Sequence, residues 1–182
     1  MKIKLTNVRL AFPVLFEAKT VNGEGKPAFS ASFLLDPADP QVKELNAAIE
    51  QVAKEKWGAK ADAILKQMRA QDKVALHDGD LKANYDGFPG NLYVSARSMT
   101  RPLVIDKDKT PLAEQDGRPY AGCYVNASVE LWPQDNNYGK RINASLRGVQ
   151  FFRDGDAFAG GGAASEDEFD DIAEGATAGD LV

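Results

Sequence analysis

Aromatic and arginine side chains alternate with apolar ones along three segments of the sequence, 92–99, 123–132 and 140–147. Successive side chains of a β-strand point to opposite faces, so this alternation gives each segment an apolar face and a face with other chemistry. The second face carries Tyr93, Arg97, Tyr124, Trp132, Arg141 and Arg147, with Glu130 as its lone acid. Aromatic rings stack on nucleic-acid bases, and guanidinium groups pair with phosphates. The pattern therefore favours a surface that binds single-stranded nucleic acid.

Loops beside these segments carry further side chains of the same kinds. We expect Tyr85 and Arg101, on either side of segment 92–99, and Tyr138 and Lys140, at the start of segment 140–147, to contact DNA as well. Exposed tyrosines and arginines are common on protein surfaces, so the whole set carries the prediction and no single member does.

Motifs for catalysis or metal binding are incomplete in this sequence. Residues 21–26 lack the G-x-x-x-x-G-K-[ST] pattern of a phosphate-binding loop. Residues 106–110 begin like a calcium loop, but Pro111 stands where such a loop needs glycine. One cysteine and one histidine exclude a multi-cysteine zinc site and any site that needs two imidazoles, and we expect Cys123 and His77 to be packing residues. We therefore expect no enzyme, no cofactor and no metal.

The elements that position these side chains are predicted from hydrophobic periodicity and from residues that start or end helices and strands. Asp39-Pro40 predicts the start of a helix and Gly58 its end, and bulges are expected at Thr6-Asn7 and at Gly148. The expected order is strands at 2–11 and 28–35, a helical insert at about 40–70, a short strand at 73–77 and strands at 92–99, 123–132 and 140–152. Helices confined to one block argue against a parallel α/β sheet. The predicted fold class is mainly β with a helical insert, an OB-fold-like five-stranded barrel.

Charge divides the chain into two parts. The 182 residues carry 22 bases and 27 acids, a net charge of -5, yet no lysine or arginine follows Arg153 and nine acids lie in 154–182. Residues 1–153 therefore hold 18 acids against 22 bases, a net charge of +4. We expect 1–153 to be the DNA-binding domain and 154–182 a disordered acidic tail, rich in glycine and alanine.

A short motif in the tail places two apolar side chains among acids. Phe169, Asp170, Asp171 and Ile172 follow a run of acids and a glycine spacer. We expect this motif to bind a partner protein, and the tail to compete with DNA for the basic body. The alternative is an arm that only increases solubility.

Nothing in the sequence predicts a membrane partner. No apolar run approaches the roughly 20 residues of a membrane span, and the alternating start at 1–5 does not have the pattern of a signal peptide. We expect a cytoplasmic protein.

Several longer stretches resemble a family of bacteriophage single-stranded-DNA-binding proteins that was long catalogued as a domain of unknown function. These are NVRLAFPVLF (7–16), KEKWG (54–58), RPYAGCYVNA (118–127), GK at 139–140 with INASLRGVQF (142–151), and RDGD (153–156). The resemblance covers essentially residues 1–156. It implies an OB-fold body, sequence-tolerant binding to single strands and a role in phage DNA replication or recombination in the host cytoplasm. The resemblance assigns no DNA-contact residues. The contact residues named above are predicted from the strand pattern alone.

Two functions follow from these observations. The first is a non-enzymatic single-stranded DNA-binding protein, with weaker duplex binding left open, which recruits phage or host replication proteins through the acidic tail. The alternative is a phage structural or assembly protein that uses the aromatic face as a protein interface. Salt separates them, because DNA binding weakens steeply as salt rises.

Overall fold

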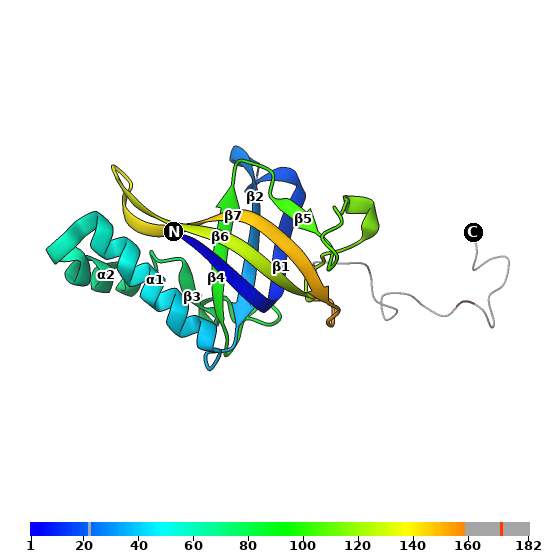
Figure 1. Cartoon of the computed structure of the whole chain (residues 1–182), viewed down its shortest axis with the longest axis horizontal. Helices are drawn as coiled ribbons and strands as arrows, with labels where there is room; N and C mark the ends of the chain where they lie inside the picture. Colours follow the sequence, from blue (N-terminus) through cyan, green and yellow to red (C-terminus); the bar gives the residue numbers. More distant parts are fainter. Residues whose placement is uncertain (22, 159–171, 173–182) are drawn as a thin grey trace.

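Seven strands and two helices make up most of the described chain, which in the computed structural model comprises residues 1–21, 23–158 and 172 (Figure 1). In chain order they are β1 (Lys2–Val21), β2 (Glu24–Leu35), α1 (Pro40–Trp57), α2 (Ala61–Ala70), β3 (Leu76–Asp78), β4 (Leu92–Ser98), β5 (Leu103–Ile105), β6 (Tyr124–Asn136) and β7 (Gly139–Arg153). Short 3₁₀ turns lie at Gly58–Lys60, Gly79–Lys82 and Glu114–Asp116. The strand β5 and the extension of β1 as far as Val21 were not predicted from the sequence.

The strands form a closed barrel. Their order in the sheet is β3-β4-β2-β1-β6-β7-β5, and β4 also pairs with β7. Five strands, β1, β2, β4, β6 and β7, therefore close on themselves, while β3 and β5 extend the edges of β4 and β7. The closing pair is parallel and joins Arg97 to Ser145, whereas the other barrel pairs are antiparallel. The predicted five-stranded, OB-fold-like barrel with a helical insert is confirmed.

Bulges bend the long strands around the barrel. Asn7 has a φ of 51°, where the register between β1 and β6 shifts. The register between β6 and β7 shifts between Leu146 and Gly148 of β7. Both bulges were predicted. A third, at Phe12 with a φ of 48°, interrupts the pairing of β1 with β2 and was not predicted. Each bulge increases the local bend, which allows β1 to pair with a neighbour on either side.

The apolar faces of the strands fill the barrel as expected. The inward-facing residues of β4, β6 and β7, together with the cysteine just before β6, are buried. They are Val94, Ala96, Cys123, Val125, Ala127, Val129, Leu131, Ile142, Ala144 and Leu146. The side chain of Asp39 caps α1, Pro40 stands in its first turn, and the helix buries Leu45 and Ile49 in the same core. Burial of each such large aliphatic side chain stabilises the fold by about 1.5–3 kcal/mol.

The helices and the β6–β7 hairpin lie on the same side of the barrel (Figure 1). The indole Nε1 of Trp57, the last residue of α1, donates a hydrogen bond of 3.0 Å to Asp135 near the end of β6. The backbone N–H of Ile142 on β7 donates to the carbonyl of Lys73, which follows α2, at 3.0 Å. These contacts hold the hairpin against the helical insert. No helix in the described part of the chain is long and apolar enough to cross a membrane.

A second, smaller cluster covers the outer face of the barrel and corrects one prediction. Tyr93 was expected to face solvent, but its side chain is only 4% exposed. Phe88, from the loop before β4, packs edge-on against it, with ring centroids 5.1 Å apart. Ala11 of β1 and Leu34 of β2 complete the buried part of the cluster. Tyr93 therefore points away from the barrel interior, as alternation requires, yet a neighbouring loop buries it.

Residues just after the predicted boundary at residue 153 contact the barrel. Phe158 packs against the second cluster, and its backbone N–H donates to the carbonyl of Ala121 at 3.0 Å. The range 154–158, which the sequence assigned to the tail, therefore ends in a contact with the barrel. The remainder of the predicted tail, residues 159–171 and 173–182, lies outside the described residues.

Candidate nucleic-acid interface

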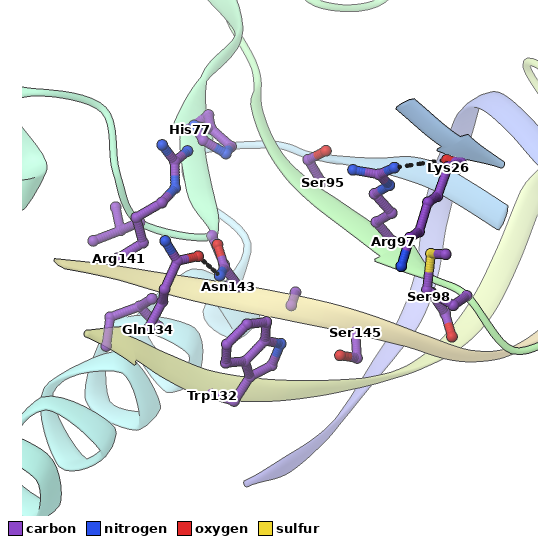
Figure 2. Close-up of a pocket in the computed structure, with 15 residues that line it drawn as sticks. Lys26, His77, Ser95, Arg97, Ser98, Trp132, Gln134, Arg141, Asn143 and Ser145 are labelled. Carbon is purple, nitrogen blue, oxygen red and sulfur yellow. Dashed lines mark hydrogen bonds between the residues drawn. The ribbon is translucent and has the colours of Figure 1, made fainter. Parts of the chain in front are cut away.

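An open groove of about 600 Å³ crosses the outer face of the barrel where β4 meets β7 (Figure 2). Its walls come from outward-facing side chains of β4, β6 and β7, together with Lys26 of β2 and residues around β3. The groove therefore lies over the seam that closes the barrel. It brings together segments that are far apart in the sequence.

The chemistry of the groove combines one aromatic platform with three cations. Trp132 is 41% exposed, and Lys26, Arg97 and Arg141 line the same groove. Among the residues that the structure describes, no aspartate or glutamate lines it. Positive charge in a hollowed surface attracts a polyanion and raises its local concentration. An exposed indole offers a flat face on which a base can stack.

Neighbouring side chains hold these groups in position. Trp132 lies opposite Asn143 in the β6–β7 register, and Gln134 lies opposite Arg141. The Asn143 side-chain amide donates to Gln134 Oε1 at 2.9 Å, and Figure 2 shows this pair beside the indole. Because both amides are engaged with each other, the floor between Trp132 and Arg141 has a defined shape before any ligand enters.

The β2 and β3 sides of the groove are also fixed. Arg97 Nη2 donates to the carbonyl of Lys26 at 3.3 Å, which holds the guanidinium across β2. His77 lines the other side, where its Nδ1 lies 2.6 Å from Asp72 Oδ1 and its ring stacks on Tyr93 at 4.8 Å. In Figure 2 the side chain of Arg141 extends toward His77. The expected packing role of His77 is present, and its ring is also part of the groove.

The structure places three of the ten predicted DNA-contact residues, Arg97, Trp132 and Arg141, in this groove. Tyr138, 87% exposed, and Lys140 lie at and beside the tip of the β6–β7 hairpin, which borders it, and Lys140 Nζ lies 3.6 Å from Asp135. Arg147 projects from the same outer face of β7, 3.4 Å from Glu130.

The other predicted residues lie elsewhere. Tyr124 is eight residues from Trp132 along β6, about 26 Å at the usual rise per residue, and the Arg153 guanidinium covers its ring at 3.6 Å. Arg101 is exposed in the turn after β4, and Tyr85 lies in the loop before it. Tyr93 is buried. Of the tail motif, Phe169, Asp170 and Asp171 lie outside the described residues, and Ile172 is exposed.

Lys26 and His77 line the groove but were not among the predicted contact residues, and a usable signal for one of them is present in the sequence. Lys26 has the same alternation parity as Ser30 and Ser32, which face outward on β2, so strand periodicity could have identified it. His77 reaches the groove because β3 pairs with β4 at Tyr93, a contact between segments that local pattern does not reveal.

The single cysteine of the sequence does not line this groove. Cys123 is fully buried, and burial raises the pKa of its thiol from 9 to about 11. A thiol with a raised pKa is a poor nucleophile near neutral pH. Within the described ranges, no group of three or more histidine, cysteine, aspartate or glutamate side chains is placed to hold a metal ion.

A closed five-stranded barrel with a basic and aromatic groove across its outer face defines an OB-fold nucleic-acid-binding architecture. The chain belongs to the family described as Enterobacter phage Enc34, ssDNA-binding protein, whose model matches residues 1–182. The predicted membership of a phage single-stranded-DNA-binding family is thereby confirmed.

Individual proteins agree with this assignment. A protein named p50, from Acyrthosiphon pisum secondary endosymbiont phage 1, is 55% identical over 175 residues, which cover 94% of each chain. The solved single-stranded DNA-binding protein of bacteriophage Enc34, in complex with ssDNA, is 28% identical with a TM-score of 0.73, over 86% of this chain and 88% of that one. The gp2.5 single-stranded DNA binding protein of bacteriophage T7 shares the fold, at 14% identity and a TM-score of 0.55, over 93% of this chain and 97% of that one.

Proposed function

We propose that this chain binds single-stranded DNA, with little dependence on sequence, in the groove across β4 and β7. A base stacks on Trp132, while Lys26, Arg97 and Arg141 neutralise phosphates. The observation that carries this proposal is the absence of acidic side chains, within the described chain, from a groove that holds an exposed indole and three cations. Stacking on an aromatic face tolerates every base, and phosphate pairing carries no sequence information.

We place the next part of the bound DNA over the β6–β7 hairpin. Tyr138 and Lys140 stand at its tip and offer a second ring and a further cation. Arg147 lies farther along β7, away from the hairpin tip, and Arg101 follows the end of β4, so both offer cations beyond the Arg97–Ser145 pairing. The proximity of Glu130 reduces the contribution of Arg147. Loops that border the barrel groove are used in this way by OB folds.

The biological role that we propose is in phage DNA replication or recombination, in the cytoplasm of the host. The acidic tail recruits replication proteins through Phe169, Asp170, Asp171 and Ile172 and competes with DNA for the basic groove. The charge division between a body of +4 and a tail with nine acids supports this role.

Fluorescence of Trp132 tests the proposal directly. The chain has two tryptophans, and Trp57→Phe leaves Trp132 as the single indole. Titration of this variant with oligothymidine is expected to quench its fluorescence as a base stacks on the ring. Emission that stays unchanged while DNA binds would show that the strand lies elsewhere. A chain that binds no DNA at low salt would favour the alternative, a phage assembly protein.

A salt series tests the pairing of cations with phosphates. The logarithm of the affinity is expected to fall linearly with the logarithm of salt concentration, with a slope that shrinks by roughly 0.7 for each single-strand phosphate that a variant no longer neutralises. Arg97→Ala and Arg141→Ala are expected to show this reduction. Arg69→Ala is the matched control, because Arg69 lies on α2 and pairs with Glu50. An equal reduction in all three variants would indicate a general charge effect and overturn the assignment of the groove.

A further inference from the structure

Two exposed aromatic side chains outside the groove, Phe12 and Tyr85, form a fixed pair. Phe12 is 46% exposed and Tyr85 is 44% exposed. Their rings meet edge to face, with centroids 5.0 Å apart and an interplanar angle of 88°. Both rest on the fully buried Phe88, at centroid distances of 5.7 and 6.2 Å. The pair therefore presents a preformed aromatic surface to solvent.

The backbone holds Phe12 in this place at an energetic cost. Its φ of 48° lies in the left-handed region, which bulky residues rarely adopt. The bulge between Ala11 and Val14 turns the side chain outward. Strain at a core residue can be offset by complete burial, but this ring stays nearly half exposed. Strained conformations cluster at ligand-binding sites, and this one displays an aromatic ring.

A row of ring contacts connects the pair to the groove. Phe88 meets Tyr93 edge-on at 5.1 Å, and Tyr93 stacks on His77, which lines the groove. Lys82 Nζ lies 5.3 Å from the centre of the Tyr93 ring and 6.0 Å from that of Phe88. A positive charge therefore stands between the groove and the exposed pair.

Two acidic side chains near Lys82, Asp78 and Asp80, accept hydrogen bonds from the backbone. Asp78 Oδ1 accepts a hydrogen bond from the backbone N–H of Asp80 at 2.9 Å, and Asp80 Oδ1 accepts one from Gly90 N–H at 2.8 Å. These bonds define the turns that carry Lys82 and Tyr85.

We propose that the strand of DNA bound in the groove continues past His77, contacts Lys82 through a phosphate and stacks a base against the Phe12–Tyr85 pair. This inference rests on the proposed function, and it assigns Phe12 and Lys82 as additional binding residues. The occupant is the same strand, because the ring row is continuous with the groove and a cation lies between them. The pair accepts any base, since every base has a π face.

Substitution of Phe12 by glycine separates binding from folding. Glycine adopts a positive φ without strain, and this relief offsets part of the packing that is lost with the ring, so Phe12→Gly is expected to remain folded. Its melting temperature is measured beside its affinity. Affinity is measured for oligothymidines from about four to sixteen nucleotides, the usual range for one OB fold. The longest oligomers are expected to lose roughly 5- to 100-fold in affinity, whereas the shortest ones, which fit the groove alone, lose none.

Two control variants isolate the cause. Asn7→Gly relieves the other positive φ of β1 without removing an aromatic ring, and Phe152→Ala removes a phenylalanine, 39% exposed, from the far end of β7. Neither is expected to change the dependence of affinity on oligomer length. A second substitution of Phe12, Phe12→Leu, keeps an apolar side chain but removes the π face. It is expected to reproduce the loss of affinity for long oligomers.

The outcomes distinguish the extension from the groove itself. If Trp132→Ala weakens every oligomer while Phe12→Gly and Phe12→Leu bind all lengths normally, the groove is correct and the extension is wrong. A loss in the Phe12 variants that is equal at every length also overturns the extension. If the unmodified chain binds no oligomer at all, the proposed function itself fails.

Discussion

The guanidinium of Arg9 covers the ring of Phe158, with its Cζ atom 4.3 Å from the ring centroid. The same group donates to the carbonyl oxygens of Asp156, at 2.8 Å, and Gly122, at 3.0 Å. Gly122 has a φ of 103°, and a Cβ atom there would overlap the Asp156 carbonyl oxygen. One arginine of β1 therefore holds residues 156–158 through two contacts, and its bond to Gly122 fixes the guanidinium in place.

Removal of this segment is expected to destabilise the body. A chain truncated after Arg153 loses Phe158 from the second cluster, at a cost of about 1–3 kcal/mol in the free energy of unfolding. A chain truncated after Phe158 keeps these contacts and is expected to unfold at the same urea concentration as the full chain. Gly122→Ala is expected to lower stability as the truncation after Arg153 does. Equal urea midpoints for the two truncated chains would contradict this role of residues 154–158.

The truncation after Phe158 also isolates the charge of the tail. It removes seven acids, leaves 22 bases against 20 acids and changes the net charge from -5 to +2. If the tail competes with DNA, affinity for oligothymidine is expected to rise, most strongly at low salt where screening is weakest. Phe169→Ala keeps every charge, so it is expected to leave DNA affinity unchanged while it weakens binding of a partner protein. Identical DNA binding with and without the tail at low salt would exclude competition.

Trp132 and Tyr124 are expected to respond differently to substitution. Trp132→Ala removes the exposed platform of the groove and is expected to weaken binding of single strands by about 1–3 kcal/mol. The ring of Tyr124 is already covered by Arg153, at the opposite end of β6, so Tyr124→Ala is expected to leave affinity nearly unchanged. Isothermal titration of folded variants with one oligomer measures both effects. A larger loss for Tyr124→Ala would place the strand at the other end of the barrel.

Burial of Cys123 predicts a pH dependence of stability. The pKa of this thiol is about 11 in the folded chain, whereas the unfolded chain loses the proton near the ordinary value of 9. Its contribution to stability is therefore complete below pH 9 and is lost as pH rises toward 11. Urea unfolding of the unmodified chain and of Cys123→Ala between about pH 8 and 10.5 is expected to show a stability difference that declines as pH increases. A difference that stays constant would mean that the thiol titrates normally in the folded chain.

The local sequence pattern was sufficient to predict the barrel, because strands that line a barrel interior carry an apolar residue at every second position. Every second residue of 125–131 and of 142–146 is apolar, and those residues, such as Val129 and Ile142, are the buried ones. The same rule assigned Trp132 and Arg141 to the outer face. It failed for Tyr93, because alternation tells which face a side chain occupies but not whether a distant loop covers that face. Phe158 was missed for a similar reason, since its partners come from elsewhere in the chain.

The seam between β4 and β7 couples ligand binding in the groove to closure of the barrel. In the described chain β4 and β7 pair at one position, Arg97 with Ser145, whereas β6 and β7 pair along most of their length. A ligand that contacts Arg97 on one strand and Arg141 on the other spans this seam, so it binds the closed barrel more tightly than an opened one. Closure and binding are then thermodynamically linked, and the apparent affinity scales with the fraction of molecules whose seam is closed. Strand separation at the seam would weaken ligand binding while every binding side chain stays unchanged, and bound ligand would in turn slow amide hydrogen exchange along β4.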